Sequence, residues 1–444
     1  MKRDCLQKIF DWNRKTVRKP LVLMGARQVG KTWLMEEFAR QAYPRNTVFL
    51  NFMAMADLSA AIAHASLTPS NLLALFQAAT GKQIIPEKTL LVLDEIQECP
   101  QALTALKFFH EQLPQQAIIV AGSLLGLSMG RSGKQNSSFP VGQIERLDVH
   151  PMTFLEFLSA IGKNGLAEAI QQGDWTTVGL LATEYETTLK NYLLIGGMPE
   201  AVATFADTNA LSKVRVKQLD ILADYDDDFK KHAPADLLGK IRLLWNNLPA
   251  QLAKENKKFI YTALRPGARA REYETALQWL DDAGMIKQVY RVSPPRLPLK
   301  SYRDIGAFKL YAHDVGLLAA MSALPIRSVL EGNALFTNFK GALTEQFVLC
   351  ELRAAGFEPA YWTADSGTAE LDFVVQSETD VVPIEVKAAT NTKAKSLAMY
   401  REAFHPVLSV KSSLKPYHAD NGLISLPLYA LGARLQAEIA ATGC

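Results

Sequence analysis

The sequence contains little cysteine, and its few cysteines lie far apart. The 444 residues include only four, Cys5, Cys99, Cys350 and Cys444, and no two of them form a CxxC pair. This spacing argues against a disulfide framework and against a cysteine-ligated zinc site. A reducing compartment fits best, so we expect a cytoplasmic protein.

Long apolar runs and a strong net charge are also missing. No stretch reaches the roughly 18 to 20 apolar residues that span a bilayer, and the opening stretch MKRDCLQKIFDWNRK has no apolar signal-peptide core. We therefore expect no membrane partner. The formal net charge of +3 permits a nucleic-acid partner but does not require one.

What the sequence does contain is three segments of different texture. With 444 residues, 48% of them hydrophobic, the chain is too long for a single core. In residues 1–205, apolar runs (LVLMG, NTVFLNF, TLLVLDE, AIIVAGS) alternate with helical stretches, which predicts a parallel sheet with crossover helices. Residues 206–328 are mainly helical and end in a basic, proline-rich stretch, and residues 329–444 read as a second, smaller α/β unit.

The clearest motif is GARQVGKT, which follows the apolar run PLVLM and precedes the helical stretch TWLMEEFARQA. A glycine-rich loop in this context cradles phosphates with its backbone N–H groups, which predicts ATP and Mg²⁺ as cofactors. Gly25 and Gly30 shape the loop, Lys31 reaches the β- and γ-phosphates, and Thr32 binds Mg²⁺. The alternative is a chance glycine turn.

Two later strand ends carry polar residues that suit the same site. LLVLDEIQ ends an apolar strand in Asp94 and Glu95. The first acid is a candidate Mg²⁺ ligand, and the second is a candidate to polarise the attacking water. Ser123 ends IIVAGS and is a candidate sensor of the γ-phosphate, although a serine at a strand end is also a common turn former.

The last segment contains acids and a lysine with the spacing of a metal-dependent phosphodiesterase. Glu385 and Lys387 in PIEVK project from one face of a strand, and Asp372 belongs to the neighbouring strand of a predicted hairpin. With Glu345 from the preceding helix, these carboxylates are candidate Mg²⁺ ligands, while Glu385 and Lys387 are candidate catalytic residues. So short a pattern also arises by chance.

The middle segment contains a candidate nucleic-acid contact. Helical stretches around Tyr273, Leu277 and Leu280 lead into IKQVYRVSPPRLPLKSYRDIGAFKLY, which has one acid, Asp304. Its basic residues suit a phosphate backbone, although a packing module or a solvated hairpin remains open. The basic residues are Lys287, Arg291, Arg296, Lys300, Arg303 and Lys309. The acidic group Asp224, Asp226, Asp227 and Asp228 reads as a solvated helix face or hinge, with a metal site as the minor reading.

Taken together, the motifs resemble the archaeal-type AAA-related P-loop ATPases that carry a C-terminal domain of unknown function. The resemblance rests on GARQVGKT, LLVLDEIQECP, AGSLLG, SFPVG, YLLIGGMPEAV, FKLYAHDVGLL, LTEQFV, ELDFVV and IEVK. It implies a RecA/AAA-like sheet with an additional strand and Glu95 as catalytic base, then a winged-helix domain, then a PD-(D/E)XK restriction-endonuclease-like domain. It also implies a nucleotide contact by Pro199 in the GGMP turn, and a homo-oligomer.

The sequence departs from this family at one place. Gln143 stands after SFPVG where such proteins often have a basic residue, with Arg131 and Arg146 nearby. An arginine finger therefore cannot be assigned.

We expect a Mg²⁺-dependent ATPase that acts on DNA, with a possible nuclease site at its C-terminus. Two alternatives remain: a non-enzymatic regulator switched by ATP binding, and a signalling or defence switch that recognises a protein partner and has a non-catalytic C-terminal domain. The sequence gives no DNA structure, oligomer size or pathway.

Overall fold

The computed structural model describes residues 2–122, 140, 142–254, 258–331, 334–364, 367, 369–388 and 394–443. These residues form two compact units. The first, the N-terminal unit, comprises residues 3–149 and 282–285, and the second comprises residues 1–2, 150–281 and 286–444.

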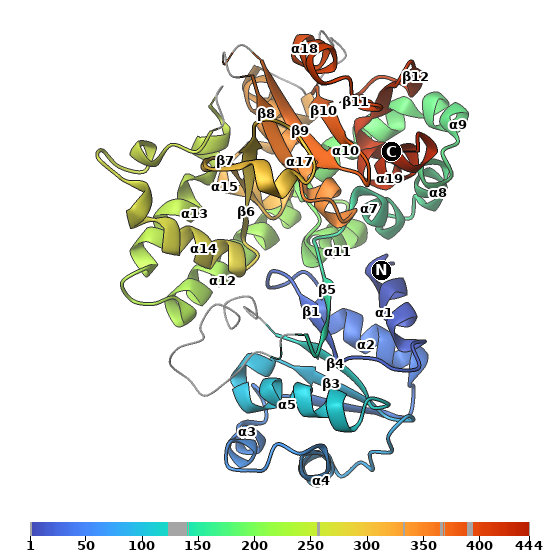
Figure 1. The fold of residues 1–444 in the computed structure, drawn as a ribbon, viewed down its shortest axis with the longest axis vertical. Helices are drawn as coiled ribbons and strands as arrows, with labels where there is room; N and C mark the ends of the chain where they lie inside the picture. The colour runs from blue at the N-terminus through green and yellow to red at the C-terminus, as the bar shows by residue number, and fades with distance from the viewer. Residues whose placement is uncertain are drawn as a thin grey trace. The chain divides into compact units, whose positions relative to one another are not determined.

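The N-terminal unit contains a five-stranded sheet in the order β2-β3-β4-β1-β5 (Figure 1). Every neighbouring pair of strands is parallel, as the alternation of apolar runs and helices predicts. The strands are β1 Leu21–Met24, β2 Thr47–Asn51, β3 Leu90–Asp94, β4 Ala117–Ala121 and β5 Glu145–Asp148. The helices are α1 Cys5–Asn13, α2 Lys31–Ala42, α3 Ala56–Ala63, α4 Pro69–Thr80 and α5 Pro100–Gln112, with a 3₁₀ turn at Ile96–Glu98.

The strand order places β4 between β1, which leads into the glycine-rich loop, and β3, which ends at Asp94 and is followed by Glu95. This is the additional strand that the family resemblance implies. All residues of β3 and β4 are buried, because helices cover both faces of such a parallel sheet. The carboxyl ends of these strands therefore open toward the start of α2.

The second unit begins with helices and continues into a large sheet. Its first helices are α7 Phe154–Ala160, α8 Asn164–Gln172, α9 Trp175–Leu180, α10 Ala182–Ile195, α11 Pro199–Thr208, α12 Leu211–His232, α13 Leu238–Leu252 and α14 Glu274–Asp282. Short 3₁₀ turns lie at Tyr261–Ala263 and Ala270–Glu272, and Tyr273, Leu277 and Leu280 are buried as their spacing predicts.

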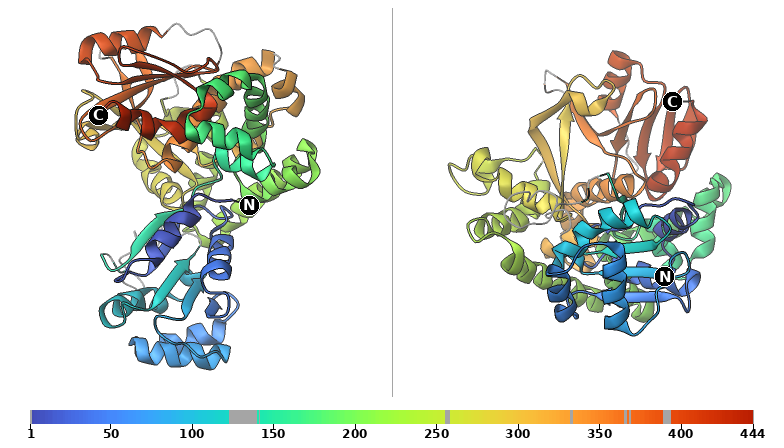
Figure 2. Two further views of the ribbon diagram at one scale, coloured as in Figure 1. Left: turned by 90° about the vertical axis from the view of Figure 1, so that its right-hand side faces the viewer. Right: turned by 60° about the horizontal axis from the view of Figure 1, so that its bottom comes forward.

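The sheet has eight strands in the order β12-β13-β11-β10-β9-β8-β6-β7 (Figures 1 and 2). The strands are β6 Ile286–Val292, β7 Arg303–Ala312, β8 Ala360–Thr363, β9 Glu370–Gln376, β10 Val381–Val386, β11 Ser409–Ser413, β12 His418–Asp420 and β13 Leu423–Pro427. The later helices are α15 Val315–Met321, α16 Ile326–Glu331, α17 Ala334–Ala354, α18 Lys395–Phe404 and α19 Leu431–Ala441, with 3₁₀ turns at Leu299–Tyr302 and Leu428–Ala430.

The predicted boundary near residue 328 does not separate two sheets. The β6–β7 hairpin, which the sequence reading assigns to the middle segment, joins the sheet of the last segment through parallel pairing of β6 with β8. A buried apolar cluster runs through both parts, from Val292 and Leu299 to Leu371 and Val374. The winged helix and the endonuclease-like fold remain predictions.

No helix among the described residues is both long and apolar enough to cross a membrane.

Candidate functional site

The glycine-rich loop joins β1 to α2 and needs glycine at both of its ends. Gly25 has a φ of +135°, and a Cβ added there would lie 2.2 Å from the carbonyl oxygen of Val149. Gly30 has a φ of +93° and directly precedes the first helical residue, Lys31. Free backbone N–H groups at the start of α2 therefore face the loop, which is the arrangement that binds phosphate.

Lys31 lies inside this loop rather than on the surface. Its ammonium group donates to the carbonyl oxygens of Gly25, at 2.8 Å, and Ala26, at 2.7 Å. Burial lowers the pKa of Lys31 to about 8, although the charges of Glu95 and Asp94 oppose this. A phosphate group entering the loop would replace weak carbonyl acceptors with charged oxygens.

The next residue, Thr32, connects the loop to β3. Its hydroxyl donates to Oδ2 of Asp94 at 3.1 Å, and the backbone N–H of Glu95 donates to Oδ1 at 3.0 Å. Burial is the main cause of the raised pKa of Asp94. A hydroxyl and a carboxylate at this separation are the oxygen ligands that Mg²⁺ prefers, and thus the site fits a Mg²⁺-nucleotide.

Glu95 directly follows β3 and lies in the left-handed region, with a φ of +51°. This conformation is uncommon for a residue with a side chain and turns the chain sharply after the strand. The Glu95 carboxylate accepts a hydrogen bond from the side-chain amide of Gln97. The acid is thus positioned next to Asp94 and half-buried, as a group that orients water requires.

In the second unit, the three predicted carboxylates lie on neighbouring elements. Glu345 is on α17, Asp372 on β9 and Glu385 on β10, and β9 and β10 are antiparallel neighbours. Asp372 accepts a hydrogen bond from the backbone N–H of Val386 at 2.8 Å. The ammonium of Lys387 lies 2.5 Å from Oε1 of Glu385, and so the spacing of PIEVK does place these two side chains together.

Two of these acids, Glu345 and Glu385, are buried, and Asp372 is partly buried. Burial, followed by the charge of Glu345, raises the pKa of Asp372 well above its ordinary value. Burial also raises the pKa of Glu385, against the opposing effect of Lys387. Oε2 of Glu385 has no hydrogen-bond partner within the described part of the chain.

Three further residues of this cluster were missed at the sequence level: Lys309, Tyr311 and Glu370. Lys309 is only 1% exposed, and its ammonium lies 2.6 Å from Glu370 and 3.8 Å from Oε2 of Glu345. Burial alone lowers the pKa of Lys309, but the surrounding carboxylates outweigh this and hold the pKa above its ordinary value. The expectation that Lys309 adds to a basic hairpin facing a phosphate backbone is therefore wrong, and so is the alternative of a solvated side chain, because the second half of β7 is buried.

Family comparison covers three stretches of the chain. Residues 17–158 match the family model of the AAA domain. This part of the chain is similar to AAA domains, and we refer to it below as the AAA domain. Residues 186–328 and 340–431 match two models that are each described as a domain of unknown function, DUF8612 and DUF4143 respectively. No curated protein matches the chain.

Several solved structures are loosely similar to the chain. A Walker-type ATPase of Pyrococcus abyssi is 13% identical, covers 72% of this chain and 95% of its own, and has a TM-score of 0.43. ORC2 of Aeropyrum pernix, in ADPNP-ADP complexes, is 12% identical over 76% of this chain and 91% of its own, with a TM-score of 0.36. ORC1 of Aeropyrum pernix in complex with DNA is 13% identical over 73% and 93%, with a TM-score of 0.30. TM-scores this low support no inference about this chain.

Some predicted residues of the AAA domain lie outside the described part of the structure. Ser123, the candidate sensor after β4, is one of them, and so is Arg131. Gln143 precedes β5, and Arg146 lies within it, paired with Val22 of β1. Neither position identifies an arginine finger.

The GGMP turn belongs to the second unit and is shaped by close packing. A Cβ on Gly197 would lie 2.1 Å from the carbonyl oxygen of Met152. Oδ2 of Asp314, a residue 1% exposed, accepts the Gly197 N–H at 2.6 Å, and Oδ1 accepts the Leu317 N–H at 2.8 Å. Pro199 is the first residue of α11. Packing thus accounts for this turn, and the nucleotide contact of Pro199 remains a prediction.

Most of the predicted basic hairpin is neutralised by ion pairs. Five of its six basic residues have an acidic partner: Lys287 with Asp281, Arg291 with Asp304, Lys300 and Arg303 with Glu358, and Lys309 with Glu370. The acidic group on α12 is paired as well, since Asp226 binds Arg242 and Lys230, and Asp227 also binds Lys230. The first set offers less free charge to phosphate than its sequence suggests, and the second is an ion-pair network on a helix face.

Positive charge gathers instead beside the carboxylate cluster. Lys411 on β11 is the register partner of Glu385. Burial, then the charge of Lys415, lowers the pKa of Lys411, and Lys387 adds to this effect. The neighbouring charge of Glu385 opposes this lowering. Positive charges that disfavour the protonated form of a lysine create a local field that an anion would relieve.

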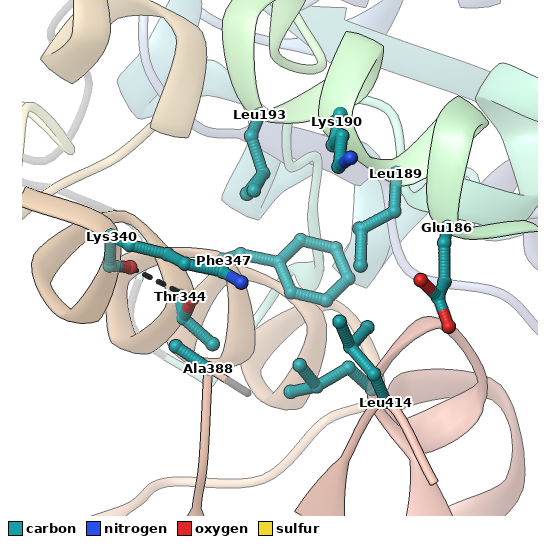
Figure 3. Close-up of a pocket in the computed structure, with 10 residues that line it drawn as sticks. Glu186, Leu189, Lys190, Leu193, Lys340, Thr344, Phe347, Ala388 and Leu414 are labelled. Atoms are coloured by element: carbon teal, nitrogen blue, oxygen red, sulfur yellow. Dashed lines mark hydrogen bonds between the residues drawn. The ribbon is translucent and has the colours of Figure 1, made fainter. Parts of the chain in front are cut away.

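A small apolar hollow adjoins this region (Figure 3). It lies between α10 and α17 and encloses about 370 Å³, open solvent included. Burial, then the charge of Lys190, lowers the pKa of Lys340 across the hollow. Its lining residues are Glu186, Leu189, Lys190, Leu193, Lys340, Thr344, Phe347, Ala388, Leu414 and Leu428.

Proposed function

We propose that this protein binds and hydrolyses ATP with Mg²⁺ in its AAA domain. The observation that carries the proposal is the Thr32–Asp94 hydrogen bond at 3.1 Å, which brings a metal-binding pair to the start of α2. Lys31 lies in the loop that would enclose the β- and γ-phosphates. Glu95, beside Asp94, is the group that would orient and deprotonate the attacking water.

A bound Mg²⁺ would neutralise part of the phosphate charge, with Thr32 and Asp94 as its protein ligands. The other steps depend on residues of the chain. Backbone N–H groups at the start of α2 bind the phosphates, Lys31 adds a positive charge, and Glu95 accepts a proton from water. We propose that the protein works as a homo-oligomer, because AAA-type sites often take a catalytic group from a neighbouring copy. We also propose that it works in the cytoplasm.

ATP hydrolysis by the purified chain with Mg²⁺ tests this proposal. Lys31→Ala should reduce turnover to background while the melting temperature changes little. The matched control is Lys107→Ala, since Lys107 forms an exposed ion pair with Glu111 on α5 of the same unit. This variant should hydrolyse ATP at the wild-type rate. Turnover that survives in Lys31→Ala would overturn the assignment of the site.

We further propose that the second unit contacts DNA through Lys411, Lys415 and the neighbouring Lys387. Support comes from the charges of Lys415 and Lys387, which lower the pKa of Lys411. Lys387 is paired with Glu385, so Lys411 and Lys415 carry the proposed contact, whereas the basic hairpin is largely ion-paired. Fluorescence anisotropy with labelled duplex, branched and single-stranded DNA at several salt concentrations tests it. Lys411→Ala/Lys415→Ala should weaken binding and lower the salt slope by about 2 for duplex DNA.

The matched control for DNA binding is Lys300→Ala/Arg303→Ala, which removes two positive charges from the hairpin. A loss confined to this control would place the DNA on the hairpin and overturn the proposed surface. Absence of binding to every DNA would favour the switch that recognises a protein partner.

That switch, with a non-catalytic C-terminal domain, is the second candidate function. The observation that favours it is the buried ammonium of Lys309 within the carboxylate cluster. Nuclease activity of this cluster, with Glu385 and Lys387 as catalytic residues, remains a prediction. Metal-dependent cleavage on a gel that is lost in Asp372→Ala would establish it.

A further inference from the structure

The carboxylate cluster of the second unit already contains a cation. Lys309 is 1% exposed, and its ammonium lies 2.6 Å from Oε1 of Glu370 and 3.8 Å from Oε2 of Glu345. The ammonium also lies 5.0 Å from the ring centre of Tyr361. Two carboxylates and an aromatic face therefore surround one buried positive charge.

The position of Lys309 follows from the pleat of β7. Lys309 and Tyr311 are two residues apart on one strand, so their side chains share a face. The hydroxyl of Tyr311 donates to Oε2 of Glu345 at 3.1 Å, the same oxygen that faces the ammonium. Glu345, one of the predicted metal ligands, is thus engaged by two groups of β7.

The other predicted ligands are engaged as well. Asp372 accepts the Val386 N–H, and Glu385 forms its ion pair with Lys387. Within the described ranges, no group of three His, Cys, Asp or Glu side chains is arranged to hold a metal ion. A divalent ion at these carboxylates would also be repelled by an ammonium only a few ångströms away, in surroundings of low dielectric. The residues present do not fit a resident Mg²⁺.

We infer that the ammonium of Lys309 takes the place of a divalent cation in this cluster, so that the carboxylates are held together without metal. A buried lysine can do this because a compact positive charge balances neighbouring carboxylates while its stem packs among apolar groups. The inference does not depend on ATP hydrolysis by the AAA domain.

Metal binding by the full chain without nucleotide tests this inference, because the P-loop then lacks the phosphates that complete its metal site. The probe is Mn²⁺, followed by calorimetric titration and by thermal unfolding. Wild type and Asp372→Asn should show the same weak or absent Mn²⁺ binding. Lys309→Met should lower the melting temperature by about 6 °C or more, as expected for breaking a buried ion pair in a unit of this size.

Mn²⁺ should then recover at least half of that loss in Lys309→Met, and none of it in Lys309→Met/Asp372→Asn. Lys287→Met is the matched control. Lys287 lies on β6, the strand paired with β7, and its ammonium lies 3.6 Å from Oδ1 of Asp281, which is not part of the cluster. We expect Mn²⁺ to have no effect on this variant.

Two results would overturn the inference. The first is micromolar Mn²⁺ binding by wild type that Asp372→Asn abolishes, since metal and ammonium would then coexist. The second is a loss of stability in Lys309→Met that Mn²⁺ does not restore. If Lys309→Met does not fold, the titration of wild type against Asp372→Asn decides by itself.

Discussion

Replacing Asp314 with asparagine should change how the stability of the second unit depends on pH. Burial raises the pKa of this carboxyl from 3.8 to about 6, although backbone N–H groups of Gly197, Leu317 and Gly316 oppose the shift. The folded chain therefore binds more protons than the unfolded chain between these two values. The contribution of Asp314 to the free energy of unfolding must rise as the pH falls from 7 toward 4.

The size of this effect follows from the shift. At pH 7 the carboxyl is ionised in both states, whereas at pH 5 it is mostly protonated only in the folded state. This difference adds about 1.3 kcal/mol to the free energy of unfolding on going from pH 7 to pH 5. Asparagine does not titrate, and the variant also lacks one of two oxygen acceptors for buried N–H groups, at a cost of about 1–3 kcal/mol at either pH.

The assay is thermal unfolding of wild type and Asp314→Asn at pH 5 and pH 7, followed by circular dichroism. Other titrating groups act on both proteins equally, and thus the difference between the two melting temperatures isolates Asp314. That difference should be larger at pH 5 by about 2–4 °C. A difference that stays constant, or that shrinks at pH 5, would refute the raised pKa of Asp314.

Two further predictions concern single side chains. Glu95→Gln should reduce ATP hydrolysis by about 10²-fold or more while ATP affinity stays within a few-fold of wild type. The reason is that amide and acid are similar in shape but only the acid accepts a proton. An unchanged rate in a single-turnover assay would show that Glu95 takes no part in the chemistry. Gly197→Ala should lower the melting temperature clearly, because its Cβ would lie 2.1 Å from the Met152 oxygen, whereas Gly165→Ala on α8, with nothing within 4 Å, should not. Equal melting temperatures for the two variants would contradict the close approach.

Much of the AAA domain could be predicted because its signals are local. The apolar runs that become β1 to β4 are each bounded by turn residues, and GARQVGKT occupies the turn where strand meets helix. In the second unit, the two-residue spacing of Glu385 and Lys387 gave their shared face correctly. Glu370 carried the same signal, since it lies two residues before Asp372 on β9.

The role of Lys309 could not be predicted in this way. The longer stretch around it is rich in basic residues, which favours a charged surface, although its immediate neighbours Phe308 and Leu310 are apolar. What buries it is the pairing of β6 with β8, strands separated by more than sixty residues in the printed sequence. Such a pairing depends on long-range packing, and no local pattern specifies it.

The same pairing has a consequence for how the chain can be divided. One family match ends at residue 328 and the next begins at residue 340. A cut between them looks natural from sequence alone. That cut would take β6 and β7 away from β8, leaving a bare strand edge on each fragment and a cluster of acids without their lysine. Exposed edges of this kind pair with other chains. Fragments made at that point should aggregate, and the two matched segments should fold only when they are kept in one piece.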